Sequence, residues 1–174
     1  MAISAEQLEI NIRSAWDPFP TPRKTDLFYS PYTWESGDLG VTEVVRQYAD
    51  RRYDEIDCGE ADFEPFWIAL FWMPPEALRY YTGGDLLCHL KALRKREVCA
   101  ELKFEGLLNM LEAFGESPRE FVYGFSAHQT NAIHSFLLYV TEQDWVNGYC
   151  IEIARTAERL WREPAAQAAF ESPV

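Results

Sequence analysis

The chain has 174 residues, the length of one ordinary domain with a single hydrophobic core. Hydrophobic residues make up 48% of it and charged residues 25%, a balance that excludes collagen-like, low-complexity and largely disordered proteins. Its 28 acidic residues outnumber its 16 basic ones, and the net charge of −12 opposes phosphate backbones and anionic lipid surfaces. We therefore expect neither a nucleic-acid ligand nor a membrane partner.

The first predicted element is a helix near the N-terminus. Ser4 and Gln7 have the spacing of a capping box, apolar residues repeat behind them at helical spacing, and Pro18 ends the pattern. Residues 19–40 follow as a long irregular segment rich in proline and aromatic residues, which we expect to wrap the domain. Within that segment, residues 26–32 are a candidate short strand because loops of this length usually contain a short element or a function.

An amphipathic pattern and an acidic loop come next. Residues 42–53 carry apolar side chains on one face and charged side chains elsewhere, which predicts a helix. Residues 54–64 then hold six carboxylates in eleven positions, and they run directly into an apolar, aromatic helix predicted over residues 65–73. The aromatic side chains of this stretch are expected in the core, where such residues dominate the packing energy, with a ligand cage as the alternative.

Two short helices separated by a glycine pair are predicted in the middle of the chain. Pro75 suits the first position of a helix over residues 76–81. Gly83-Gly84 is expected to stop that helix, and Asp85 to cap the next one, whose cations gather toward its C-terminal end.

The second half of the chain is predicted to be helical. A long helix over residues 98–114 has one apolar stripe, and Gly115 is its expected C-cap. Ser126 and Gln129 repeat the capping-box spacing before another apolar periodic run. The last helix is predicted over residues 145–161.

These patterns predict an all-α protein. We expect a single compact domain over residues 1–174, with six to eight helices and a long irregular N-terminal segment. No fixed-period repeat or linker-like stretch divides the sequence. Residues 164–174, which begin with a proline, are predicted to form a frayed tail.

The spacing of the cysteines and the N-terminal residues indicate where in the cell the protein is expected. Cys58, Cys88, Cys99 and Cys150 form no C-x-x-C pair and no zinc-ribbon spacing, so four reduced thiols are expected. The first residues lack the basic start and apolar core of a secretory signal, which favours a cytoplasmic location. Residues 121–141 carry no formal charge, but too many polar side chains interrupt them for a transmembrane helix.

No motif in the sequence carries a specific chemistry. Ser126 follows Gly124 as in a hydrolase nucleophile elbow, but the final glycine is replaced by His128, and an N-cap role explains Ser126 better. His134 lies six residues after His128, too far round a helix for a shared metal. We expect no cofactor and no metal. An acidic row on one helix face could bind a divalent cation with a partner helix, although a solvated face is favoured: Glu101, Glu105 and Glu112.

The acidic loop points to recognition of a basic partner. Six carboxylates in a short segment generate a local field that speeds encounter with a cationic protein. The residues expected to make that contact are Asp57, Glu60, Asp62 and Glu64.

Two stretches resemble an uncharacterised bacterial domain family of unknown function. Residues 75–81 read Pro-Glu-Ala-Leu-Arg-Tyr-Tyr, and residues 129–137 carry the later Gln-x-x-Ala-Ile-x-x-Phe-Leu helix. The likeness covers residues 63–142, and Thr-Gly-Gly stands after the tyrosines where the family has Leu-Pro. This resemblance implies a small cytoplasmic bacterial protein and transfers no catalytic residue, because the family has no established activity.

The Pro-Glu-Ala box supplies two ligand-binding candidates, Arg79 and Tyr80. A guanidinium beside phenols suits a carboxylate-bearing ligand. A structural pair between Arg79 and Glu76, three residues back on the same helix, is the favoured role for Arg79.

Three functions remain open at this point. The first is a non-enzymatic, acidic, cytoplasmic protein that binds another protein, in the manner of an immunity factor that neutralises a basic toxin. The second is a small-molecule or metal-dependent enzyme whose site lies between helices. The third is a homodimer that buries exposed aromatic residues.

Overall fold

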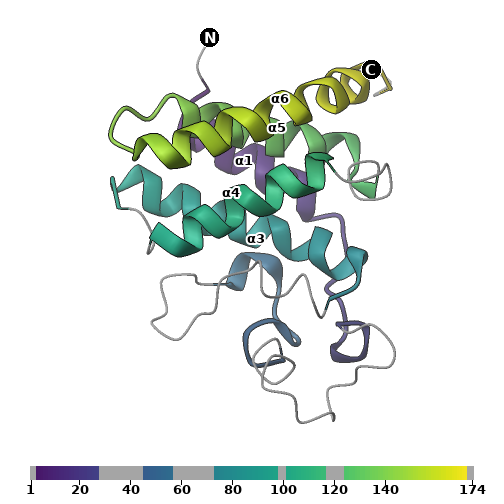
Figure 1. The fold of residues 1–174 in the computed structure, drawn as a ribbon. Helices are drawn as coiled ribbons and strands as arrows, with labels where there is room; N and C mark the ends of the chain where they lie inside the picture. Colours follow the sequence, from purple (N-terminus) through teal and green to yellow (C-terminus); the bar gives the residue numbers. More distant parts are fainter. Residues whose placement is uncertain (1–2, 28–44, 57–72, 98–100, 117–123, 172–174) are drawn as a thin grey trace.

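The computed structural model describes residues 3–27, 45–56, 73–97, 101–116 and 124–171. Every regular element in these ranges is helical, which confirms the predicted all-α class (Figure 1). The elements are α1 (Ala5–Trp16), the 3-10 helices η1 (Lys24–Asp26) and η2 (Tyr53–Glu55), α3 (Pro75–Arg94), α4 (Glu101–Glu116), α5 (Ala127–Thr141) and α6 (Gly148–Glu171).

The helices pack around one cluster of buried apolar side chains to which all five α-helices contribute. Helix α6 packs against α5 and α4, while α1 bridges α5 and α3. Helix α3 also carries η2 on its other side, so that η1 and η2 lie beyond α3 and away from α6 (Figure 1). No helix in the described ranges is long and apolar enough to cross a membrane.

Both predicted helix starts are confirmed by side-chain caps. The Ser4 hydroxyl accepts the Gln7 backbone N–H at 3.2 Å, and Ser126 does the same for Gln129. Gln129 returns the bond, because its side-chain oxygen accepts the Ser126 N–H at 3.0 Å. Each serine thus satisfies an amide that the first turn of a helix leaves without a partner.

The predicted stop at Gly83-Gly84 is wrong, because α3 runs through both glycines without a break. A Cβ on Gly83 would lie 2.5–2.7 Å from ring carbons of Trp16, and one on Gly84 would overlap the carbonyl oxygen of Tyr53. The glycines are therefore the places where α1 and η2 touch the α3 backbone. Tertiary contact outweighs the helix-breaking tendency of about 1 kcal/mol per glycine. Asp85, the predicted cap, lies inside the helix and is buried.

Two further helix ends differ from the prediction. The helix expected over residues 42–53 is helical at residues 45–48 and gives way to a turn in which Asp50 has φ of 58°. Gly115 is no C-cap, because it lies within α4, where a Cβ would come 2.6 Å from Cβ of Leu160. Asp50 suits the left-handed conformation that ends a helix, since its short polar side chain tolerates it.

The last helix is shifted and longer than predicted. It begins at Gly148, after a turn that holds Trp145, and continues through Pro164 to Glu171. The expected frayed tail therefore does not start at Pro164. Ala165, the next residue, is only 4% exposed, so its burial favours continuation of the helix there.

The cysteines also depart from the expectation of four reduced thiols. Cys88 is disulfide-bonded, whereas Cys150 is free and buried in the core. Cys150 therefore packs as a small apolar residue. The predicted strand at residues 26–32 begins in η1 rather than in a strand, and residues 28–40 and the apolar segment at 65–72 lie outside the described residues.

Candidate functional site

A cleft of about 760 Å³ opens in front of the first turn of α3. One wall is the chain that leaves α1, from Phe19 to Pro22, and the other is Pro74, Ala77 and the side chains that follow on α3. Its volume falls within the range of small-molecule sites, and its walls combine apolar surface with a few polar groups. We call it the Arg79 cleft, after the cation on its wall.

Tyr80 is held on the cleft wall by neighbouring aromatic rings. Its ring stands edge-on to Tyr53 at 5.7 Å and to Tyr81 at 5.0 Å, an arrangement favoured by aromatic quadrupoles. Its hydroxyl shares a hydrogen bond of 2.8 Å with the Thr21 hydroxyl, which ties α3 to the opposite wall. Tyr53 in turn donates to Asp17 at 2.6 Å, and burial together with this contact raises the pKa of its phenol.

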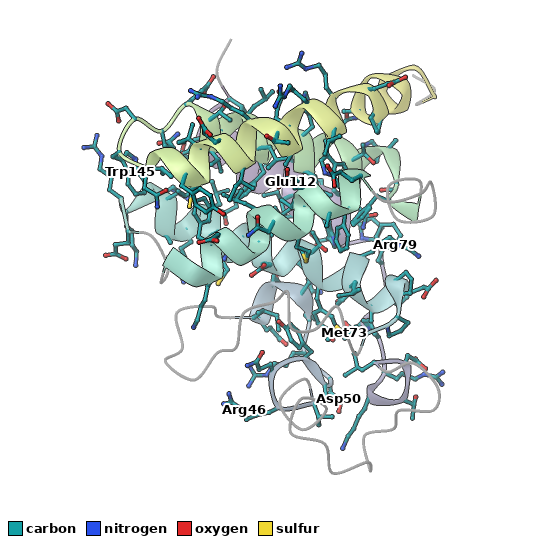
Figure 2. The ribbon with its side chains drawn as sticks, in the orientation of Figure 1. Arg46, Asp50, Met73, Arg79, Glu112 and Trp145 are labelled. Atoms are coloured by element: carbon teal, nitrogen blue, oxygen red, sulfur yellow. The ribbon has the colours of Figure 1, made fainter. Side chains whose placement is uncertain are left out.

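Arg79 is fixed through its backbone rather than its guanidinium. The indole N–H of Trp16 donates to the Arg79 carbonyl at 2.7 Å. The guanidinium lies on the bare backbone of Gly124, where a Cβ would overlap it. It lies at the opposite end of the helical bundle from Trp145 (Figure 2).

The side chain of Arg79 is mostly buried, but its guanidinium is weakly bonded. Its side chain is 20% exposed, and its one hydrogen bond among the described residues is to Glu76 at 3.4 Å. That distance exceeds the 2.7–2.9 Å of a strong charge-assisted hydrogen bond. Glu76 itself is 75% exposed. The predicted pair between Glu76 and Arg79 is confirmed, but it leaves most of the donors of Arg79 available.

Gln129 adds an amide donor to the same cleft. It is 3% exposed and lines the cleft, and its carboxamide oxygen already accepts the Ser126 N–H. Its Nε2 group has no hydrogen-bond partner among the described residues. The group is not one of the fully buried polar atoms that lack a partner, so it keeps contact with solvent and is available to a ligand in the cleft.

The first turn of α3 contributes backbone donors. Pro74 is the N-cap and offers no side-chain cap, and Pro75 has no N–H. The amides of Glu76 and Ala77 therefore lie at the positive end of a 20-residue helix, without partners within it. Both residues line the Arg79 cleft.

The second cationic group on the cleft wall is already neutralised. Arg23 donates to both carboxylate oxygens of Asp26, at 2.8 and 3.2 Å. This hydrogen bonding lowers the pKa of Asp26 and raises that of Arg23. The cleft thus presents one weakly paired guanidinium, that of Arg79.

A second cleft, of about 520 Å³, lies between α1, η2 and the C-terminal half of α3. Its charged groups largely pair with one another. Arg13 bonds Glu9 at 3.3 Å and Asp54 at 3.0 Å, and Arg94 bonds Glu9 at 2.9 Å. Lys91 and Lys95 also line this cleft, but both are exposed to solvent, whereas the Arg79 side chain is mostly buried.

A buried pair of titratable residues lies deeper in α3. Nε2 of His89 is 3.6 Å from Oδ1 of Asp85, and the two residues are 1% and 3% exposed. Nε2 of His89 and Oδ2 of Asp85 have no hydrogen-bond partner in the part of the chain that the structure describes. Burial raises the pKa of Asp85 to about 8 and lowers that of His89 to about 3, so both side chains are neutral at pH 7.

Comparisons with known proteins add no relationship. No family model, no curated protein and no solved structure matches the chain. The site is therefore interpreted from its own residues.

The predicted ligand-binding residues Arg79 and Tyr80 both line the Arg79 cleft. The predicted partner-binding residues Asp57, Glu60, Asp62 and Glu64 lie outside the described residues. Of the acidic row on α4, Glu105 and Glu112 are partly exposed, and no group of three potential metal ligands occurs among the residues that the structure describes.

Several cleft residues were not found from the sequence. Gln129 was assigned only to a capping box, although a capping glutamine has a second polar end. Gly124 was considered only in a hydrolase motif, and Thr21 only as part of an irregular segment. For the Asp85 and His89 pair, the i, i+4 spacing was a usable signal, but the assumed helix stop before Asp85 concealed it.

Proposed function

We propose that the protein binds a small organic acid in the Arg79 cleft. The observation that carries this proposal is Arg79, whose side chain is four-fifths buried on the cleft wall and whose guanidinium has one long hydrogen bond among the described residues. A desolvated guanidinium favours a carboxylate, because two parallel N–H donors match its two oxygens. The free amino group of Gln129 and the uncapped first turn of α3 also favour a negatively charged group on the ligand.

The rest of the cleft suits an apolar ligand body. Phe19, Pro20, Pro22, Pro74 and Ala77 supply flat apolar surface on both walls. Burial of such surface contributes about 25 cal/mol per Å². The ligand class supported here is therefore an acid with a carboxylate at one end and an apolar remainder.

Binding of a basic protein through the acidic segment remains a second proposal from the sequence. It rests on the charge of Asp57, Glu60, Asp62 and Glu64. Binding in the Arg79 cleft is favoured because side chains within the described residues, and their contacts, support it.

The proposal is tested by titrating 3-phenylpropionate into the protein and following backbone amide shifts by NMR. The uncharged 3-phenylpropanamide serves as the matched probe without a carboxylate. We expect 3-phenylpropionate to bind more tightly, with shifts at Gly124 and at the first turn of α3. Loss of the guanidinium in Arg79→Gln should weaken its binding about ten- to hundredfold, since hydrogen bonds to charged groups are worth about 1.5–3 kcal/mol.

The control is Arg155→Gln, which makes the same charge change on an exposed residue of α6 away from the cleft. It should leave the affinity within twofold of the wild type. Equal affinities for Arg79→Gln and Arg155→Gln would exclude Arg79 as the carboxylate site. Failure of the wild-type protein to bind either probe would refute the proposed function.

A further inference from the structure

Glu76 places a carboxylate of the protein itself beside Arg79. It stands in the first turn of α3, three residues before Arg79, and both line the Arg79 cleft. The dipole of α3 favours an acidic residue at this position, and the i, i+3 spacing brings the two side chains onto one face. Glu76 therefore stays near Arg79 whether or not a ligand is bound.

The contact between the two side chains is weak because Glu76 is exposed and its hydrogen bond is long. Its carboxylate is 75% exposed and approaches Nη2 of Arg79 at 3.4 Å. Exposed ion pairs of this kind contribute little, because solvent screens them and holding two long side chains in place costs entropy. A ligand carboxylate that enters the cleft from the apolar side has stronger donors to gain, because it reaches the desolvated guanidinium and the free amino group of Gln129.

We infer that Glu76 is a built-in competitor, which occupies Arg79 in the empty cleft and gives way to the carboxylate of a ligand. The inference rests on the proposed function. It adds a contact that regulates binding, and it specifies the charge of the ligand. Glu76 acts through Arg79: it makes the affinity of the cleft for a carboxylate ligand lower than it would be if the guanidinium had no competing partner.

The same contacts select a monoanionic ligand. Arg23 is neutralised by Asp26, so Arg79 is the one weakly paired guanidinium on the cleft wall. The carboxylate of Glu76 also lines the cleft and repels a second negative charge. A monocarboxylate with an apolar body therefore fits, and a phosphate monoester, which carries nearly two charges at neutral pH, is disfavoured.

The test compares Glu76→Gln with the wild type in titrations of 3-phenylpropionate, 3-phenylpropanamide and phenyl phosphate. Glu76→Gln removes the competing charge and keeps the size of the side chain. We expect it to bind 3-phenylpropionate about two- to fivefold more tightly, which is the affinity equivalent of an exposed ion pair. Its affinity for the uncharged amide should not change, because the amide does not compete for Arg79.

Glu152→Gln is the matched control, since it removes an exposed carboxylate from α6, away from the cleft. It should leave all three affinities within 1.5-fold of wild type, roughly the scatter expected of a distant surface charge. Wild-type protein should bind phenyl phosphate several-fold more weakly than 3-phenylpropionate.

The outcomes separate this inference from the function on which it rests. Binding of 3-phenylpropionate by the wild type with no gain in Glu76→Gln, or with equal gain in Glu152→Gln, overturns the competitor role and leaves the proposed function standing. Phenyl phosphate that binds as well as 3-phenylpropionate overturns the selection of a monoanion. Absence of binding to the wild-type protein refutes the proposed function, and the inference falls with it.

Discussion

Replacement of Asp85 by Asn should stabilise this protein at neutral pH. The Asp85 carboxyl lies inside α3 with His89 one turn away and the ring of Phe104 on α4 packed 5.3 Å from the imidazole. Burial raises its pKa from 3.8 to about 8, and Lys103 opposes this only in part. The folded protein therefore holds a proton that the unfolded chain releases.

The cost follows from the difference between the two pKa values. At pH 7 the carboxyl must be kept protonated about three pH units above its unfolded pKa, which costs on the order of 4 kcal/mol. That is a large share of the 5–15 kcal/mol by which domains are usually stable. The amide of Asn has nearly the shape of a neutral carboxyl and needs no proton, so Asp85→Asn removes this cost.

The dependence on pH has a definite sign. Since the folded state binds the Asp85 proton more tightly, this residue makes stability fall as pH rises from about 4 to about 8. His89 has its pKa lowered from 6.5 to about 3 by burial, so its contribution to stability rises from about pH 3 to pH 6.5. The two slopes oppose each other between about pH 4 and 6.5. In Asp85→Asn, only the contribution of His89 to the pH dependence of stability remains from this pair.

The assay is urea unfolding of both proteins at pH 4, 5.5, 7 and 8.5. The free energy of unfolding should be similar at pH 4, and the advantage of Asp85→Asn should grow steadily up to pH 8. His89→Gln is the complementary variant, whose advantage should appear only below pH 6.5. An Asp85→Asn protein that is less stable than the wild type at pH 7 would show that Asp85 is ionised and paired in the fold, and would refute this reasoning.

Two further substitutions test the backbone of α3. Gly83→Ala should lower the free energy of unfolding by about 2 kcal/mol, because its Cβ meets the Trp16 ring and this clash outweighs the better helix propensity of Ala. The control is Gly148→Ala in α6, where a Cβ has nothing within 4 Å, and it should be neutral or stabilising. A stabilised Gly83→Ala in urea unfolding would contradict the contact. Arg96 follows the C-terminal end of α3 with φ of 57°, a conformation that glycine adopts without strain. Arg96→Gly should therefore stabilise the folded protein by about 1 kcal/mol and raise its melting temperature. An unchanged melting temperature would argue against strain at this position.

Local sequence patterns predicted the helices well where local chemistry decides them. The caps at Ser4 and Ser126 follow from a hydroxyl that reaches an orphan amide within the same turn. The pairing of Glu76 with Arg79 follows from i, i+3 spacing in the same way. The homodimer, the basic partner and the resemblance to a bacterial family stay predictions.

Residues that contact distant parts of the chain misled the same reasoning. Gly83 and Gly115 were assigned as helix ends, but they are small because Trp16 and Leu160 need the space. Such contacts join positions far apart in the sequence, so no local pattern contains them. Pro164 likewise continues a helix because the neighbouring residue is buried.

The sequence by itself determined the all-α class and the pairing of Arg79 with Glu76, because composition, periodicity and capping act over a few residues. It also named Arg79 and Tyr80 as ligand candidates. Only the tertiary structure decided that these residues share a cleft with Gln129 and the segment that follows α1. Only the packing of the helices also decided that Asp85 is buried beside His89, because desolvation depends on the surrounding elements and not on the helix that carries the residue.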